Sequence, residues 1–304
     1  MSLSPPHFHD EHDEAIGSLL LAERHHMPEN DYLRRCRERS VDVSGRVEAV
    51  NWILKVQAFY EFRPVTAFLS VNYLDRFLSC CSLPSESGWA FQLLSVACLS
   101  LAAKMEESHV PFLLDLQLFH PTFIFHPKTV QRMELWVMTH LKWRLRSVTP
   151  FDYLHYFISN LPSSSSTIDH FSTASNLILS TTRVHHFLAF APSTVAAAAV
   201  LCSAGYNAQQ LPLSFHHRLN QEMVRCCHQL MEEYVLDTCL ASTSTIKPTI
   251  AEPTSPSSPV GVLDAATCAS CDTPSDRNFA ASTHQQAEPP NKRPRPSTPD
   301  VPQR

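Results

Sequence analysis

Two charged residues, Lys104 and Glu134, stand at positions where the helical pattern otherwise places apolar side chains. The stretch LLSVACLSLAAKMEE, from Leu93 to Glu107, is apolar for two to three helical turns before the lysine. Successive residues of a helix are rotated by 100° about its axis, so Lys104 lies within about 20° of Leu93. Its charge therefore stands at the end of an otherwise apolar face. Glu134 lies within a later apolar stripe of helical period. That stripe comprises Val130, Met133, Val137 and Leu141.

A carboxylate on a core-facing stripe is costly unless it is paired. One interpretation is structural: the stem of Lys104 runs along the apolar surface, Glu134 lies at the edge of its stripe, and the two charges pair with each other. The other interpretation is functional: both charges lack a partner in the free chain, and the lysine is placed to hold something else. The pattern alone leaves both open.

Asp75, in the stretch VNYLDRFL, is flanked by large apolar side chains. A carboxylate in such surroundings needs a cation, and Arg46, at the start of the preceding helical segment, is the candidate. We expect this pair to be structural rather than catalytic, because it would orient one helix against the next.

No residue pattern supports catalysis, a cofactor or a bound metal. The five glycines are isolated along the chain, so the dinucleotide and P-loop fingerprints are absent. The 17 histidines show no zinc-site spacing, and we expect the paired ones to be solvated. Cys268 and Cys271 form a single C-x-x-C without a second pair, which indicates neither metal nor redox chemistry.

Composition also limits the partners. The formal net charge of −5 disfavours binding of nucleic acid by the whole surface. The ten cysteines are scattered, often within apolar segments, as in reduced cytosolic or nuclear proteins. The N-terminal stretch MSLSPPHFHDEHDE has no apolar signal region, and the longest apolar run is interpreted as too short to span a bilayer.

Scarce glycine favours helices over hairpin-linked sheets, so we expect an all-α fold. Residues 1–43 form a lead-in whose first ten residues look unstructured and which carries a short helix. The next helical segments are expected at about 44–60, 64–81, 88–107, just after Pro111 and 127–145. Further segments are expected at about 149–160, 168–182, 192–204 and 216–239. Residues 241–304, rich in Pro, Ser and Thr, are expected to be a disordered tail.

The chain resembles the D-type cyclins of plants. The matching stretches are HMPENDYLRRCR, VEAVNWILKVQ, FLSVNYLDRFLS, LLSVACLSLAAKMEES, RMELWVMTHLKWRLRSVTPFDYLHYF and GVLDAA. They cover roughly residues 11–270. The resemblance implies two consecutive five-helix cyclin boxes, at 44–146 and 147–240. It also implies that the chain is not an enzyme but binds and activates a cyclin-dependent kinase at the G1/S transition.

The signature positions of the first box fall on Arg46, Asp75, Leu93, Lys104 and Glu134. In the family the Arg/Asp pair is internal, whereas the Lys/Glu pair hydrogen-bonds kinase main chain near the αC helix that carries the PSTAIRE sequence. The resemblance therefore implies kinase binding by Lys104, Glu134 and Leu93, with exposed apolar side chains of the third and fifth helices as the interface core. A PSTAIRE-type kinase is the expected partner, and kinase-inhibitor proteins are further candidates.

Two family features are changed. Residues 1–40 contain no L-x-C-x-E, the motif by which plant D-type cyclins dock on retinoblastoma-related proteins, so the resemblance does not support that docking. The substrate-docking patch of mitotic cyclins reads M-R-A-I-L followed by Trp. Here GRVEAVNW retains Trp52 but has Glu48 where an aliphatic residue is usual. We expect docking of R-x-L substrates to be weaker or shifted toward basic peptides.

The tail holds four candidate phosphosites that precede proline: Ser255, Ser258, Thr273 and Thr298. A regulated rapid-turnover segment and a passive tail are both open interpretations. A basic cluster, with Lys292, Arg293 and Arg295, is a candidate nuclear localisation signal. We therefore expect the chain in the nucleus and also in the cytoplasm.

Two other functional classes share the cyclin fold. A transcription factor like general transcription factor B would need a basic face and usually a zinc ribbon, and the sequence indicates neither. A scaffold that binds kinase or inhibitor without strong activation remains open, because the docking patch is changed and the L-x-C-x-E motif is missing.

Overall fold

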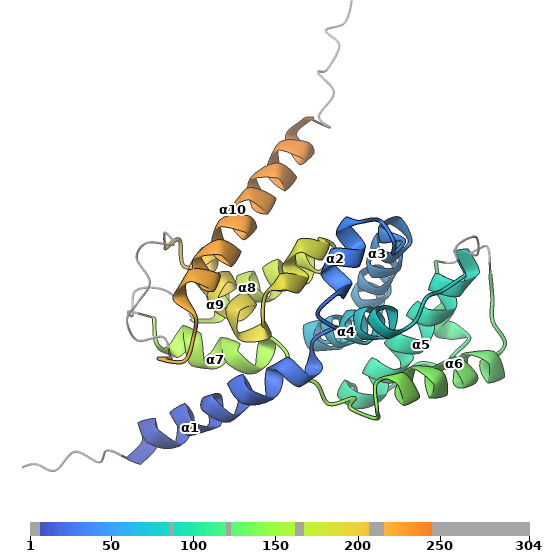
Figure 1. Ribbon diagram of the computed structural model, residues 1–304, viewed down its shortest axis with the longest axis horizontal. Coiled ribbons are helices and arrows are strands. Elements are labelled where there is room, and N and C mark those ends of the chain that lie inside the picture. Colours follow the sequence, from blue (N-terminus) through green and yellow to red (C-terminus); the bar gives the residue numbers. More distant parts are fainter. Residues whose placement is uncertain (1–6, 85–87, 120–122, 162–166, 207–215, 245–304) are drawn as a thin grey trace, which may run out of the picture. The chain divides into compact units, whose positions relative to one another are not determined.

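The computed structural model describes residues 7–84, 88–119, 123–161, 167–206 and 216–244, and these residues form helices joined by loops, without strands (Figure 1). The lead-in contains α1 (His7–Ala22), the 3-10 helix η1 (Glu23–His26) and α2 (Tyr32–Arg37). The first helical group is α3 (Val43–Tyr60), α4 (Pro64–Cys80), α5 (Gly88–Glu106), η2 (Asp115–Gln117) and α6 (Pro127–His140). The second is α7 (Phe151–Ser159), α8 (Thr167–Thr181), η3 (His185–Ala189), α9 (Pro192–Ser203) and α10 (Gln221–Ser244). The expected all-α fold is confirmed.

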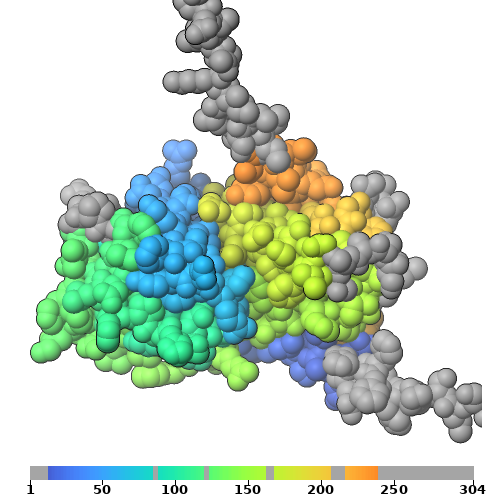
Figure 2. Space-filling model, turned by 180° about the vertical axis from the view of Figure 1, so that it is seen from behind, coloured from blue at the N-terminus to red at the C-terminus, as the bar shows by residue number. Residues whose placement is uncertain are grey.

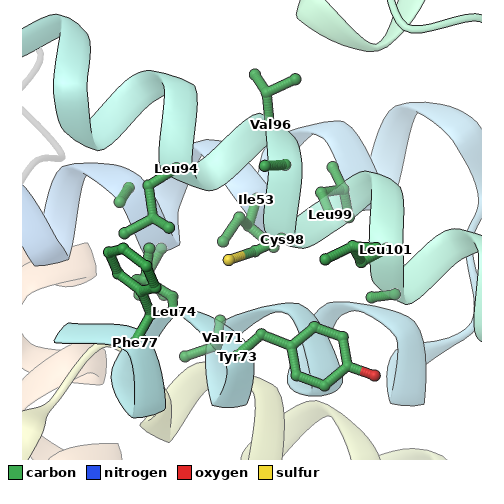
Figure 3. Packing of buried hydrophobic residues seen from close by; sticks show 14 of the residues in the cluster. Ile53, Val71, Tyr73, Leu74, Phe77, Leu94, Val96, Cys98, Leu99 and Leu101 are labelled. Atoms are coloured by element: carbon green, nitrogen blue, oxygen red, sulfur yellow. The ribbon is translucent and has the colours of Figure 1, made fainter. Parts of the chain in front are cut away.

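The first group packs around α5, which lies against α3, α4 and α6. Figure 3 shows side chains of α3, α4 and α5 meeting in one apolar cluster, among them Ile53, Leu74 and Leu99. Local signals set the helix starts. The Asp42 carboxylate caps α3 by accepting a hydrogen bond from the Gly45 amide at 2.9 Å, and Pro64 occupies the first turn of α4.

The length and composition of α5 would also suit a membrane span, so the prediction that its apolar run is too short was wrong. However, 72% of its apolar stretch is buried inside the protein. Burial on this scale is what the central helix of a packed domain requires, because its neighbours cover it on several sides.

The second group packs around α9, which contacts α7, α8 and α10. Ten of the twelve residues of α9 are buried, including a run of four alanines, Ala196–Ala199. Small side chains let the neighbouring helices approach closely, which is why a helix so poor in bulk forms the centre of this cluster. Ile16 of α1 belongs to the same cluster, so the lead-in packs on the second group. In Figure 2 the two groups adjoin directly.

Several helices differ from the sequence pattern at their ends. α1 begins at His7, within the segment expected to be unstructured. α10 continues to Ser244, beyond the expected end near residue 239, since each added residue of a formed helix gains a backbone hydrogen bond. α6 ends at His140 rather than near 145, because Lys142 and Trp143 adopt left-handed backbone angles, with φ of 53° and 60°.

The helix expected after Pro111 is only the short η2. The Gln117 side chain explains this difference, because it fixes the segment as a loop. Its amide nitrogen donates to the main-chain oxygens of Leu113 and Phe125 at 2.9 and 3.0 Å, and its oxygen accepts from the Phe125 amide at 2.6 Å.

Candidate functional site: a charged pair on the surface of the first domain

Arg46 of α3 and Asp75 of α4 form a buried ion pair. Arg46 Nε lies 2.6 Å from Asp75 Oδ1 and Nη2 lies 2.7 Å from Oδ2, with both side chains at most 2% exposed. The Tyr32 hydroxyl also donates to Asp75 Oδ1, at 3.0 Å. The pair expected from the sequence therefore forms, and it fixes α2, α3 and α4 against one another.

Electrostatics keep this cluster in one protonation state. Burial would lower the pKa of Arg46, but the charge of Asp75 and its hydrogen bonds outweigh that effect, so the pKa is raised. Burial and the nearby Asp75 carboxylate raise the pKa of Tyr32 well above its usual value. The arginine stays charged and the phenol stays a donor at physiological pH.

Lys104 of α5 and Glu134 of α6 pair with each other. Lys104 Nζ lies 2.6 Å from Glu134 Oε1 and 2.8 Å from Oε2. The expectation that both charges lack a partner in the free chain was therefore wrong, because the two helices lie side by side and bring them together (Figure 1). The pairing that the structural interpretation predicted is present.

The pair nevertheless retains bonding capacity. The Lys104 side chain is 46% exposed, whereas that of Glu134 is 7% exposed. An ammonium group has three donors, and a carboxylate has about four lone-pair positions. Two contacts within the pair leave at least one N–H of Lys104 directed at solvent, and further acceptor capacity on the carboxylate.

Exposed apolar side chains lie near the pair in the sequence. Met105 follows Lys104 on α5 and Leu135 follows Glu134 on α6, and both are exposed. Trp143, just past α6, is 65% exposed in its left-handed conformation. Leu93, by contrast, is buried in the first cluster, so the free chain does not expose the side chain for which the resemblance implied kinase binding.

Comparisons with known proteins identify the family. Residues 14–146 match the family described as "Cyclin, N-terminal domain", and residues 148–257 match "Cyclin, C-terminal domain". The chain is 45% identical over 233 residues to Cyclin-D1-1 of Arabidopsis thaliana, covering 74% of this chain and 69% of that protein. It is 44% identical over 228 residues to Cyclin-D2-1 of rice, Oryza sativa subsp. japonica, covering 73% and 70%.

The chain belongs to the D-type cyclins of plants. The solved structure of a viral cyclin from herpesvirus saimiri shares the fold, with a TM-score of 0.53, 15% identity, and coverage of 65% of this chain and 86% of that one. As a cyclin, the chain is a non-catalytic regulatory subunit that binds a cyclin-dependent kinase.

The two residues at the predicted substrate-docking patch differ in exposure. Trp52 is buried, and its indole N–H donates to the Leu118 main-chain oxygen at 3.0 Å. Glu48 is exposed on the same helix. A peptide reaching this surface would therefore meet the carboxylate rather than the open face of the indole ring.

Two buried charges were not predicted from the sequence. Glu23 accepts hydrogen bonds from the amide and hydroxyl of Ser193, at 2.9 and 2.8 Å, and from the Tyr153 hydroxyl at 3.1 Å. Burial raises its pKa although these hydrogen bonds oppose the shift. Glu23 thus caps α9 from the lead-in. Its place at the end of an apolar run, LLLAE, resembles that of Lys104 and was the available signal.

The second missed charge is Arg76. Its guanidinium donates to the main-chain oxygens of Arg144 and Leu141, at 3.0 and 3.4 Å, and to the Ser147 hydroxyl at 3.0 Å. It therefore holds the segment that leaves α6. Burial lowers its pKa. Arg76 follows Asp75 within the apolar stretch VNYLDRFL, and this position was the available signal.

The paired histidines, which were expected to be solvated, differ in their exposure. His216 is buried rather than solvated, whereas His25, His186 and His217 are exposed. No cluster of histidine, cysteine or acidic residues that could hold a metal exists within the described residues.

The predicted sites of the tail lie outside the described residues. They are the candidate phosphosites Ser255, Ser258, Thr273 and Thr298, the basic residues Lys292, Arg293 and Arg295, and the Cys268/Cys271 pair.

Proposed function

We propose that this cyclin binds and activates a PSTAIRE-type cyclin-dependent kinase and so promotes the G1/S transition, in the nucleus and also in the cytoplasm. The observation that carries the proposal is the Lys104–Glu134 pair, in which the carboxylate is nearly buried while the half-exposed lysine keeps a spare donor at the surface. Exposed Met105 and Leu135 beside it supply apolar area for an interface core.

The pair would contact kinase main chain near the αC helix. A free N–H of Lys104 donates to a kinase carbonyl, and Glu134 accepts from a kinase amide. Because Glu134 already binds Lys104 through both oxygens, the two side chains are ordered before the kinase arrives. Such preorganisation reduces the entropy cost of association.

Activation follows from a difference in affinity between two kinase states. A kinase with αC turned inward forms its catalytic Lys–Glu pair, and one with αC turned outward does not. Binding that favours the inward state shifts the population toward it. A shift from 1:99 to 99:1 needs about 10⁴-fold tighter binding to the inward state, or about 5.5 kcal/mol.

The decisive variant exchanges the two charges, K104E together with E134K. The exchanged pair still neutralises itself, so we expect helical content and melting temperature to stay close to those of the wild type. The donor and acceptor positions offered to the kinase are reversed, so we expect capture of a PSTAIRE-type kinase to fall at least about tenfold, as for loss of 1.4 kcal/mol or more.

The exposed pair Arg34 and Glu38, joined at 3.2 Å, provides the matched control. The exchange R34E with E38R should leave both kinase capture and stability unchanged. Normal kinase capture by the exchanged Lys104/Glu134 variant, or unfolding of that variant, would show that the pair is only structural.

A scaffold without strong activation is the second candidate, favoured by the changed docking patch with its exposed Glu48 and buried Trp52. Phosphorylation of histone or of a retinoblastoma-related substrate by the captured kinase separates the two. Capture without stimulated phosphorylation would indicate the scaffold. The same complex, incubated with kinase-inhibitor proteins, tests them as further partners.

A further inference from the structure

A groove of about 610 Å³ separates the end of α2 from η3. We call it the arginine groove. It is lined by Cys36, Arg37, Arg39, Val41, Asp42, Val43, Ser44, His185 and His186. The lead-in, the start of α3 and the segment between α8 and α9 all contribute, so three stretches distant in sequence build it. It lies apart from the Lys104–Glu134 pair on α5 and α6.

The two arginines of the groove have no partner within the described part of the chain. Neighbouring arginines of the same segment are occupied. Arg34 pairs with Glu38 at 3.2 Å, and Arg35 donates to the main-chain oxygens of Ser79 and Leu78 at 2.7 and 3.0 Å. Arg37 and Arg39 are exposed, and no described side chain or carbonyl binds either guanidinium. Both are therefore available to an anion.

Arg39 is held in a conformation that favours glycine. It follows α2 with a φ of 55°, and the Ser40 amide bonds back to the Arg35 oxygen at 3.0 Å, as in a Schellman cap. A residue with a Cβ is disfavoured in this left-handed geometry, because the Cβ comes too close to the following carbonyl oxygen. Arginine at such a position is unexpected from folding alone, which points to a role for its side chain.

Two histidine rings also line the groove. The rings of His185 and His186 lie 4.2 Å apart between centroids. Burial, and then the charges of His186, Arg46 and Arg37, lower the pKa of His185, so it is a neutral ring that can donate one hydrogen bond. Asp42 is the carboxylate among the lining residues, and its Oδ1 is occupied by the Gly45 amide.

We propose that the arginine groove binds a phosphorylated serine or threonine of a protein partner. A phosphate monoester carries nearly two negative charges and three acceptor oxygens, which suits two free guanidinium groups and outweighs the single Asp42 carboxylate. An extended nucleic acid is disfavoured by the net charge of −5. Resting on the proposed function, the partner is a kinase substrate that already carries one phosphate.

Fluorescence anisotropy with the full-length chain tests the proposal. The probe is a labelled degenerate peptide with one fixed phosphoserine, compared with the same peptide carrying serine. We expect at least about tenfold tighter binding of the phosphopeptide, which inorganic phosphate weakens by competition. Equal affinity for the two peptides would overturn the proposal, as would equally strong competition by DNA carrying the same number of charges.

Three variants separate binding from folding. Arg39→Gly removes the guanidinium while suiting the left-handed backbone, so phosphopeptide affinity should fall at least tenfold without loss of melting temperature. Asp42→Asn keeps a helix-capping residue but removes the opposing charge, so affinity should rise several-fold. Arg34→Gln, on the same short helix, should change nothing. If Arg34→Gln lowers phosphopeptide affinity as much as Arg39→Gly does, the general positive charge of the segment explains the binding. That outcome would overturn the proposal.

Kinase capture by the same variants keeps the two proposals distinct. Arg39→Gly should capture kinase normally. Specific phosphopeptide binding by a chain that captures no kinase would support the groove while contradicting the proposed function. Kinase capture without phosphopeptide binding would contradict the proposal for the groove while supporting the proposed function.

Discussion

Two ion pairs of this cyclin differ in their exposure to solvent. Arg46 and Asp75 are enclosed and saturated, and their ion pair joins α3 to α4. Lys104 and Glu134 are saturated only in part, since the lysine is half exposed. The same chemistry therefore gives an enclosed brace in one place and a partly exposed pair in the other. The difference lies in how much of each pair solvent can reach.

Loss of the internal brace should be costly. Arg46→Met leaves the Asp75 carboxylate buried without its cation, and removal of one member of a buried pair destabilises proteins by about 3–5 kcal/mol. We expect a free energy of unfolding lower by this amount in urea denaturation. Arg34→Met, at the exposed pair with Glu38, should cost less than about 0.5 kcal/mol. Similar effects of both variants would show that burial does not set the energetics of the Arg46 pair.

Periodicity predicted the positions of these residues but not whether their charges are paired. The positions of Lys104, Glu134, Arg46 and Asp75 on apolar faces were evident from periodicity. Whether the first two meet each other depends on how α5 and α6 pack, and periodicity within one helix carries no information about its neighbour. Glu23 was missed for the same reason, because its partners are 130 and 170 residues away.

At the scale of elements, the interiors of helices could be predicted better than their ends. Apolar stripes gave α3, α4, α5 and α9 nearly correctly, since many residues contribute to each stripe. The end of α6 depends on two left-handed residues, Lys142 and Trp143, and neither is of a type that signals such a conformation. The loop around η2 depends on one glutamine side chain, Gln117, which no local pattern reveals.

The contact between η1 and α9 should depend on pH through Glu23. Burial raises its pKa above the ordinary value of 4.5, so the folded state binds this proton more tightly than the unfolded state does. Its contribution to stability is therefore fully present below the unfolded pKa and is lost as pH rises through the folded pKa.

Glu23→Gln, which mimics the protonated form, isolates this effect from other carboxylates. The free energy of unfolding of the wild type minus that of the variant should fall as pH rises from about 4 toward neutrality. Urea denaturation at several pH values measures the difference. A difference that increases with pH would mean that the hydrogen bonds from Ser193 and Tyr153 outweigh burial.

At the scale of the whole described chain, the two apolar clusters are connected by several contacts. Phe68 and Phe151 pack against both clusters, and their rings lie 6.1 Å apart. Arg46 Nη1 donates to the Arg183 main-chain oxygen at 3.3 Å, and Arg183 Nε donates to Asn51 Oδ1 at 2.8 Å. These links favour unfolding of both helical groups together.

Tryptophan fluorescence can test this coupling, because all four tryptophans precede residue 147: Trp52, Trp89, Trp136 and Trp143. Fluorescence therefore reports the first domain alone, whereas far-ultraviolet circular dichroism reports helices of both. We expect coincident midpoints for the wild type, as in a two-state transition. Phe68→Ala should separate the midpoints. Separate transitions in the wild type would show that the groups are independent.

Among the described residues, Gly205 is the glycine with positive φ, whereas Arg39, Glu61, Phe119, Lys142 and Trp143 adopt such angles without being glycine. Each exchange to glycine at these sites would recover up to about 1 kcal/mol. The free energy of unfolding of this chain is therefore lower than its backbone geometry allows. A few substitutions outside the core would therefore give a more stable form of this cyclin. That form would lose whatever contacts those five side chains make.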